Sequence, residues 1–108
     1  MPVYVIALIA VEDGAAYAEY QRHGLPTVAA AGGRLIAGGE GLTLEGEDLP
    51  TSSAVVEFPT MDAAFAWYHS EAYQSAIPLR LSSSKVQTIS ILPGLVAEPG
   101  SGTQGQRV

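Results

Sequence analysis

The sequence contains no cysteine, so disulfide bonds and thiolate metal ligands are excluded. A small secreted scaffold held together by disulfides is therefore ruled out, and we expect a cytoplasmic protein. Basic residues are also scarce, since five Lys and Arg stand against eleven Asp and Glu, for a net charge of -6. Nucleic-acid binding depends on clustered basic side chains, so we expect no nucleic-acid partner.

Long hydrophobic runs and cofactor motifs are missing as well. The apolar run Val3–Val11 is far shorter than the roughly 20 residues of a membrane span, and no basic segment precedes it as in a signal peptide. The two histidines, His23 and His69, fall on different expected helices, which argues against a metal site. The glycine pairs lack the spacing of a phosphate-binding loop. We therefore expect no membrane association, no metal and no cofactor.

The apolar residues that are present make up 47% of the chain. Val3–Val11 is β-branched and almost continuously apolar, which predicts a strand covered on both faces. A chain of 108 residues supports one core and one layer of helices, and that layer covers one face of a sheet. The other face needs a second subunit, so the sequence predicts a homodimer that packs through its sheet faces.

The expected elements alternate between strands and helices. A helix capped by Asp13 is expected over Ala15–His23, with a kink or restart at Pro26 and a continuation through Ala31. The other expected helices are Ala63–Tyr68 and Glu71–Ala76, the latter ending before Pro78. The expected strands are Val3–Val11, Arg34–Gly39, Ala54–Phe58 and Val86–Leu92, with a short one at Leu42–Leu44. The order predicts an α+β fold of the ferredoxin-like βαββαβ type, an antiparallel sheet with helices on one face, over residues 1–95.

The Gly-rich and polar tail 96–108 is expected to be disordered.

Several short motifs resemble a known group of proteins. They are Tyr17-x-x-Tyr20, Gly32-Gly33-Arg34-Leu35, Gly38-Gly39, Leu44-Glu45-Gly46, Val56-Glu57-Phe58-Pro59, Trp67-Tyr68-x-Ser70-x-x-Tyr73-Gln74 and Pro78-x-Arg80. In this order they resemble an uncharacterised bacterial family with a domain of unknown function, within the dimeric α/β-barrel superfamily. That superfamily includes cofactor-free monooxygenases, polyketide cyclases, isomerases and haem enzymes, so the resemblance implies the fold and leaves the activity open. His69, and with it His23, departs from the family pattern.

The candidate catalytic residues are His23, Glu57, Arg80 and Tyr20. Glu57 interrupts an apolar strand, which suits either a general base, a partner of Arg80 or a charge at a solvated rim. His23 has the helical spacing to share a face with Tyr20, or it is simply solvated beside the kink. Arg80 suits bidentate binding of a carboxylate, phenolate or enolate, or an ion pair with an acidic residue.

Aromatic residues supply candidate walls for a small organic ligand, or core and interface packing. The candidate substrate-binding residues are Trp67, Tyr68, His69 and Tyr73. These candidates predict a cofactor-independent enzyme that acts on a small aromatic or polyketide-like molecule by acid/base catalysis. Cyclisation, isomerisation, decarboxylation and oxygenation all fit, with His23 or Glu57 as base, Arg80 on the oxyanion and Tyr20 orienting the substrate. The alternative is a non-catalytic dimer that binds a metabolite or serves as an interaction module.

Overall fold

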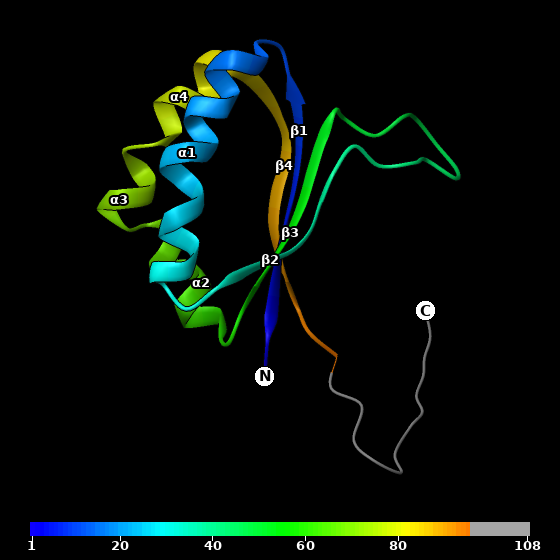
Figure 1. Cartoon of the computed structure of the whole chain (residues 1–108). Helices are drawn as coiled ribbons and strands as arrows, with labels where there is room; N and C mark the ends of the chain where they lie inside the picture. The colour runs from blue at the N-terminus through cyan, green and yellow to red at the C-terminus, as the bar shows by residue number, and fades with distance from the viewer. Residues whose placement is uncertain (96–108) are drawn as a thin grey trace.

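A computed structural model describes residues 1–95, and the tail 96–108 predicted to be disordered lies outside the described residues. One sheet carries all helices on one of its faces (Figure 1). The elements are β1 (Val3–Val11), α1 (Gly14–Ala30), β2 (Arg34–Gly39), β3 (Ser52–Phe58), α2 (Met61–Tyr68), α3 (Glu71–Gln74), α4 (Ile77–Ser83) and β4 (Ser84–Pro93). Within these residues no helix is long and apolar enough to cross a membrane.

The sheet has the strand order β2-β3-β1-β4, and every neighbouring pair is antiparallel. This order confirms the predicted split βαβ arrangement, because β3 inserts between the strands that α1 connects. Register fixes which side chains face the helices. Val5 pairs with Val56 and Ile91, and all three point toward the helical layer.

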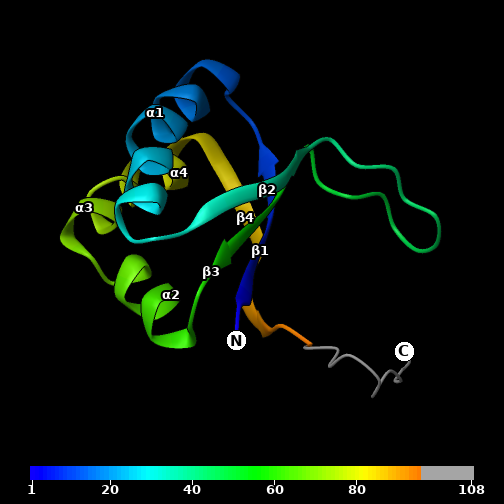
Figure 2. The same ribbon diagram turned by 60° about the horizontal axis from the view of Figure 1, so that its bottom comes forward.

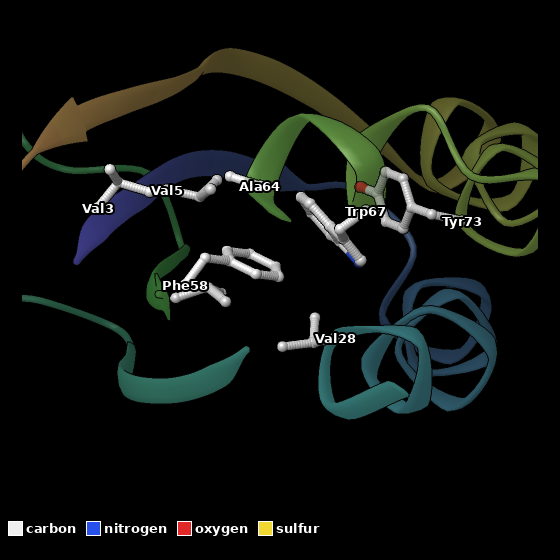
Figure 3. Packing of buried hydrophobic residues seen from close by; sticks show 8 residues of the cluster. Val3, Val5, Val28, Phe58, Ala64, Trp67 and Tyr73 are labelled. Carbon is white, nitrogen blue, oxygen red and sulfur yellow. The ribbon is translucent and has the colours of Figure 1, made fainter. Parts of the chain in front are cut away.

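The core lies between the sheet and the helices. Phe58 and Tyr73 are completely buried, and the indole of Trp67 lies between them, with ring centroids 5.3 Å from Phe58 and 4.3 Å from Tyr73 (Figure 3). Gly33 passes so close to Phe58 that a Cβ atom there would lie 2.5 Å from the ring. The turn that enters β2 therefore requires glycine at this position.

The structure differs from the prediction at Pro26. The helix does not restart there, because α1 runs from Gly14 to Ala30 with Pro26 inside it. Proline removes one backbone hydrogen bond, but Tyr17, Gly24 and Val28 are buried against the rest of the molecule. Tertiary packing of this stripe holds the helix together across the proline.

Two further expectations about secondary structure were wrong. Leu42–Leu44 does not form a strand, because these residues belong to a connection that leaves the sheet between β2 and β3. The segment around Pro78 also differs, because α3 ends at Gln74 and a further helix, α4, begins at Ile77 and carries Arg80 in its last turn. Pro78 is tolerated in the first turn of α4, where a backbone N–H has no helical partner.

Candidate active site

A cavity of about 440 Å³ lies between α1 and the helix-facing side of the sheet. Its size falls within the range of small-molecule sites, roughly 300 to 1,000 Å³. The polar side chains that line it are Tyr17, Tyr20, Gln21, Ser52 and Tyr73, and the rest of the wall is aliphatic, Trp67 or backbone. An apolar chamber with a few polar groups is typical of a site for an organic molecule.

The wall on the α1 side is one stripe of the helix. Tyr17, Tyr20, Gly24 and Val28 follow one another at helical spacing and all line the cavity. His23, whose spacing suggested a face shared with Tyr20, does not continue this stripe, and the structure places Gly24 there, buried against Tyr20 and Tyr73.

The polar centre of the site consists of Tyr20, Tyr73 and Arg80, which come from α1, α3 and α4. The two phenolic oxygens lie 2.7 Å apart, and Nη1 of Arg80 donates a 2.7 Å hydrogen bond to Oη of Tyr73. The guanidinium carbon of Arg80 also lies 6.0 Å from the centre of the Tyr20 ring, within cation–π range. We call these three residues the Tyr–Tyr–Arg cluster.

Arg80 is an unusual buried charge. Only 5% of the residue is exposed, and within residues 1–95 no carboxylate lies within salt-bridge distance of it. Its Nε atom is buried and has no hydrogen-bond partner among these residues. A buried cation costs several kcal/mol when no anion compensates it, of order 3 to 5 kcal/mol in broken ion pairs. The cluster is therefore electrostatically prepared for a negative charge.

A count of the phenolic hydrogens shows whether the Tyr–Tyr–Arg cluster has a free hydrogen-bond donor. Each phenol has one hydrogen, and the contact between Tyr20 and Tyr73 uses only one of the two. Arg80 supplies its own hydrogen to Tyr73, so it uses neither phenolic hydrogen. One O–H of the pair is therefore uncommitted within the cluster, and both tyrosines line the cavity.

The titration of the cluster follows from burial. Burial raises the pKa of Tyr20 well above its ordinary value, and the neighbouring Tyr73 raises it further. Burial also raises the pKa of Tyr17, while a hydrogen bond from Ser52 opposes the rise. For Arg80, burial lowers the pKa, but Tyr73 and Tyr20 outweigh it and the net pKa is raised. Near neutral pH the cluster thus combines a protonated Tyr20 with a cationic Arg80.

Tyr68 and His69 lie elsewhere. They line a second cavity of about 300 Å³ with Phe65, beside β4. The His69 ring stacks on Phe65 with centroids 6.1 Å apart. Trp67 lines both cavities, so of the four predicted substrate-binding residues it and Tyr73 line the chamber of the Tyr–Tyr–Arg cluster.

The structure does not bring His23, Glu57 and Arg80 to one cavity. The His23 side chain is 61% exposed and lies 3.7 Å from Glu19 on the outer side of α1. Glu57 lies on the sheet face opposite the helices, where it accepts hydrogen bonds from Arg34 (2.7 Å) and from the Tyr4 hydroxyl (3.3 Å). The partnership with Arg80 considered for Glu57 is therefore not formed.

Sequence reasoning missed part of the site. Ser52 lines the cavity, on the same side of the sheet as its β1 partner Ile9, and its side chain hydrogen-bonds to Tyr17. Nothing in its local sequence marks it, because its placement depends on the pairing of β3 with β1. Tyr17 was readable from the Tyr17-x-x-Tyr20 spacing, which puts both phenols on one helical face. Across residues 1–95 no three His, Asp or Glu side chains converge on a point that could hold a metal.

A family described as a domain of unknown function, DUF1330, matches residues 2–95. The chain belongs to the DUF1330 family. This confirms the resemblance drawn from the short motifs. No curated protein matches this DUF1330 chain.

Solved structures share the fold of this DUF1330 chain. The protein of unknown function RPA0582 from Rhodopseudomonas palustris is 21% identical, with a TM-score of 0.72 over 89% of this chain and 84% of its own. SnoaB, a cofactor-independent oxygenase from Streptomyces nogalater, is 9% identical, with a TM-score of 0.66 over 91% and 97%. A dimeric protein of unknown function with a ferredoxin-like fold from Bacteroides fragilis is 14% identical, with a TM-score of 0.52 over 84% and 92%. These likenesses confirm the predicted ferredoxin-like α+β fold.

Proposed function

We propose that this DUF1330 chain binds a small, mostly apolar aromatic or polyketide-like molecule and stabilises its phenolate or enolate without a cofactor. The observation that carries the proposal is the buried Arg80, which has no carboxylate partner among residues 1–95 and is linked through Tyr73 to Tyr20 at the cavity wall. Hydrogen-bond donors fixed where negative charge develops are the main source of oxyanion stabilisation in enzymes. The uncommitted phenolic hydrogen is such a donor.

The chemistry assigned to each residue follows from its position. One tyrosine of the pair donates to the ligand oxygen, and Arg80 acts through Tyr73 as a positioning residue that strengthens this donor. Cyclisation, isomerisation, decarboxylation and oxygenation of such molecules share an enolate or phenolate, so one donor cluster serves all of them. The fold of SnoaB, described as a cofactor-independent oxygenase, supports cofactor-free chemistry on this scaffold.

Binding is tested with α-naphthol, whose phenol and phenolate forms absorb at different wavelengths. We expect the naphthol pKa to fall on binding, because the cluster favours the anion. Arg80→Lys keeps the charge and loses the planar fork, so affinity for the naphtholate should fall by about 1.5 to 3 kcal/mol, roughly 10- to 100-fold. Tyr68→Phe, in the second cavity, is the matched control and should bind as the wild type does. Equal binding by Arg80→Lys and the wild type, with a lowered melting temperature, would make Arg80 purely structural.

Catalysis is tested by hydrogen exchange. In heavy water, β-tetralone loses a proton from the carbon beside its carbonyl to solvent base, forms an enolate and takes up deuterium, which NMR detects. We expect the wild type to accelerate this exchange and Tyr20→Phe to lose about tenfold or more of the acceleration.

The second candidate function is non-catalytic binding. It is favoured by one observation, that among residues 1–95 no Asp, Glu, His or Lys side chain lines the cavity to serve as a general base. Naphtholate binding without accelerated exchange would select this candidate.

The second part of the proposal concerns assembly, and it retains the homodimer that packs through its sheet faces. The face of the sheet away from the helices carries apolar side chains, of which Ile6, Leu8 and Val55 are half-buried in the single chain and Leu92 is exposed. The fold is shared with a protein described as dimeric. Light scattering at micromolar concentration should give twice the chain mass, and a stable monomer would contradict the dimer. The interface should bury more than about 1,200 Å² in total.

A further inference from the structure

The connection between β2 and β3, residues 40–51, forms an ordered arm. It is much longer than the usual hairpin connection of about two to five residues. Inside it, the Leu49 amide donates to Oγ1 of Thr43 at 2.8 Å, and Leu49 packs so close to Gly41 that a Cβ there would lie 2.6 Å away. At its base, the Val11 amide donates to Oγ1 of Thr51 at 2.9 Å. These contacts fix the direction in which the 40–51 arm leaves the sheet.

That direction is away from the helices. Figures 1 and 2, which differ by a 60° rotation, both show the 40–51 arm extending from the sheet on the side opposite the helical layer. The uncovered apolar face of the sheet lies on this same side. The arm and the face proposed for the dimer therefore point toward the same space.

The 40–51 arm carries apolar side chains into that space. Leu42 is 84% exposed and Leu44 is 88% exposed. Single exposed leucines are ordinary on protein surfaces. Two at alternate positions of an arm held by its own hydrogen bonds form a local apolar strip, which gains free energy on burial.

The length of the 40–51 arm indicates where its apolar strip lies in a dimer. Packed sheets lie about 10 Å apart. Each limb of the arm has about six residues, which at roughly 3.3 Å per residue spans up to about 20 Å. The arm is longer than the space between the sheets, so an arm that projects away from its own sheet can reach an edge of the facing sheet. The edge strand β4 exposes apolar side chains that suit the strip, Val86 and Leu92, whereas Leu35 and Ile36 of the other edge strand, β2, line the chamber of the candidate site.

We propose that in the homodimer the 40–51 arm of each copy clasps the sheet edge of the other copy and buries Leu42 and Leu44 there. The occupant of the apolar strip is a second copy of this chain. This inference rests on the proposed homodimer, and it adds the arm to an interface otherwise formed by the sheet faces.

The test measures dimer dissociation of the full chain by dilution in sedimentation or light scattering. The double variant Leu42→Ser/Leu44→Ser should raise the dissociation constant about tenfold or more, because both side chains lose apolar burial. Glu45→Gln/Glu47→Gln, which changes the charge of the same arm and leaves its leucines, is the matched control and should change it much less. Exposed positions of the arm leave the fold intact, which melting curves verify.

A second readout uses the lack of cysteine in the chain. In a Leu44→Cys variant the single thiol should react with an alkylating reagent several times more slowly at dimer concentrations than at monomer concentrations. A wild-type dimer whose dissociation constant is unchanged by the leucine variant, with an equally reactive thiol at both concentrations, would overturn the clasp and leave the dimer standing. A monomeric wild type would overturn both. Naphthol binding tests the cavity independently of either result.

Discussion

Two arginines, Arg34 and Arg80, lie on opposite sides of the same sheet and differ in the partner that each one contacts. Arg34 on β2 lies in the open, with its side chain 74% exposed, and pairs with Glu57, which also accepts from the Tyr4 hydroxyl. Arg80 is buried and pairs with the phenol of Tyr73. The first arrangement neutralises its cation within the chain. The second has no carboxylate partner among residues 1–95 and is linked through Tyr73 to the wall of a cavity, as the proposed binding site requires.

The largest expected effect separates these two arginines directly. Arg80→Met should remove most of the affinity for naphtholate, at least roughly 10-fold, because the buried cation is lost. Arg34→Met on the other face should leave that affinity unchanged. Isothermal titration of both variants measures the contrast, and equal losses would erase the distinction between the two sites.

We also expect a specific effect of Arg80→Met on the free energy of unfolding. Replacing an uncompensated buried charge with an apolar side chain of similar length is often neutral or stabilising. Arg80→Met should therefore keep the free energy of unfolding within about 1 kcal/mol of the wild type while it loses the ligand. A drop of about 3 to 5 kcal/mol in denaturant melts would show that Arg80 is part of the structural core.

The phenols sharpen the comparison at a smaller scale. Tyr20→Phe removes one hydroxyl from the Tyr–Tyr–Arg cluster and should weaken naphtholate binding by about 0.5 to 1.5 kcal/mol. Tyr4→Phe removes the hydroxyl that donates a hydrogen bond to Glu57 on the opposite face, and it is the matched control. An equal change in both variants would mean that the cluster has no special role.

Alkaline pH tests the burial of the cluster. The pKa of Tyr20 is raised in the folded chain, so below the ordinary tyrosine pKa of about 10 both the folded and the unfolded states are protonated and the stability is fully present. Above that pH the unfolded chain releases the proton while the folded chain retains it, so the free energy of unfolding should fall as pH rises. Denaturant melts of the wild type and Tyr20→Phe above pH 10 measure this, and Tyr20→Phe should show the shallower decline.

The smallest effect is expected on the exposed face. Glu57→Gln removes the ion pair with Arg34, and exposed pairs contribute about 0.2 to 1 kcal/mol. The loss should shrink further at high salt, because salt screens exposed charges. These values apply to melts at low concentration, where the chain is monomeric; in the proposed homodimer the same face is covered, so at high concentration the loss should be larger and less sensitive to salt.

The fold was predictable because its signals are local. Val3–Val11 is apolar throughout, Asp13 and Thr60 cap the helices that follow them, and turn residues separate the elements. The errors occurred where tertiary packing overrides local preference. Pro26 remains inside α1 because that helix is packed, and Pro78 was taken as an ending when it lies in the first turn of α4.

The site was less predictable, because its parts come from separate elements. Tyr20, Tyr73 and Arg80 could each be singled out as reactive or aromatic, but their contacts span α1, α3 and α4. Glu57 and Arg80 carry opposite charges, yet the alternation of side chains along β3 places Glu57 on the far face of the sheet. The residue types indicated which side chains can take part in acid/base or oxyanion chemistry. Strand register and helix packing decide which of these side chains lie in contact.

Gly24 is a position where a single substitution would change the width of the chamber. It lies on α1 at the cavity wall, where an added methyl group would come within 3.4 Å of the Tyr20 ring and 3.7 Å of the Tyr73 ring, ordinary contact distances. An alanine therefore fits without moving the backbone, and it favours the helix by about 1 kcal/mol over glycine. Keeping glycine preserves room beside the phenols. For the proposed ligand, a relative with alanine here accepts only a narrower molecule at the same phenols, so one inherited change divides the range of ligands between lineages.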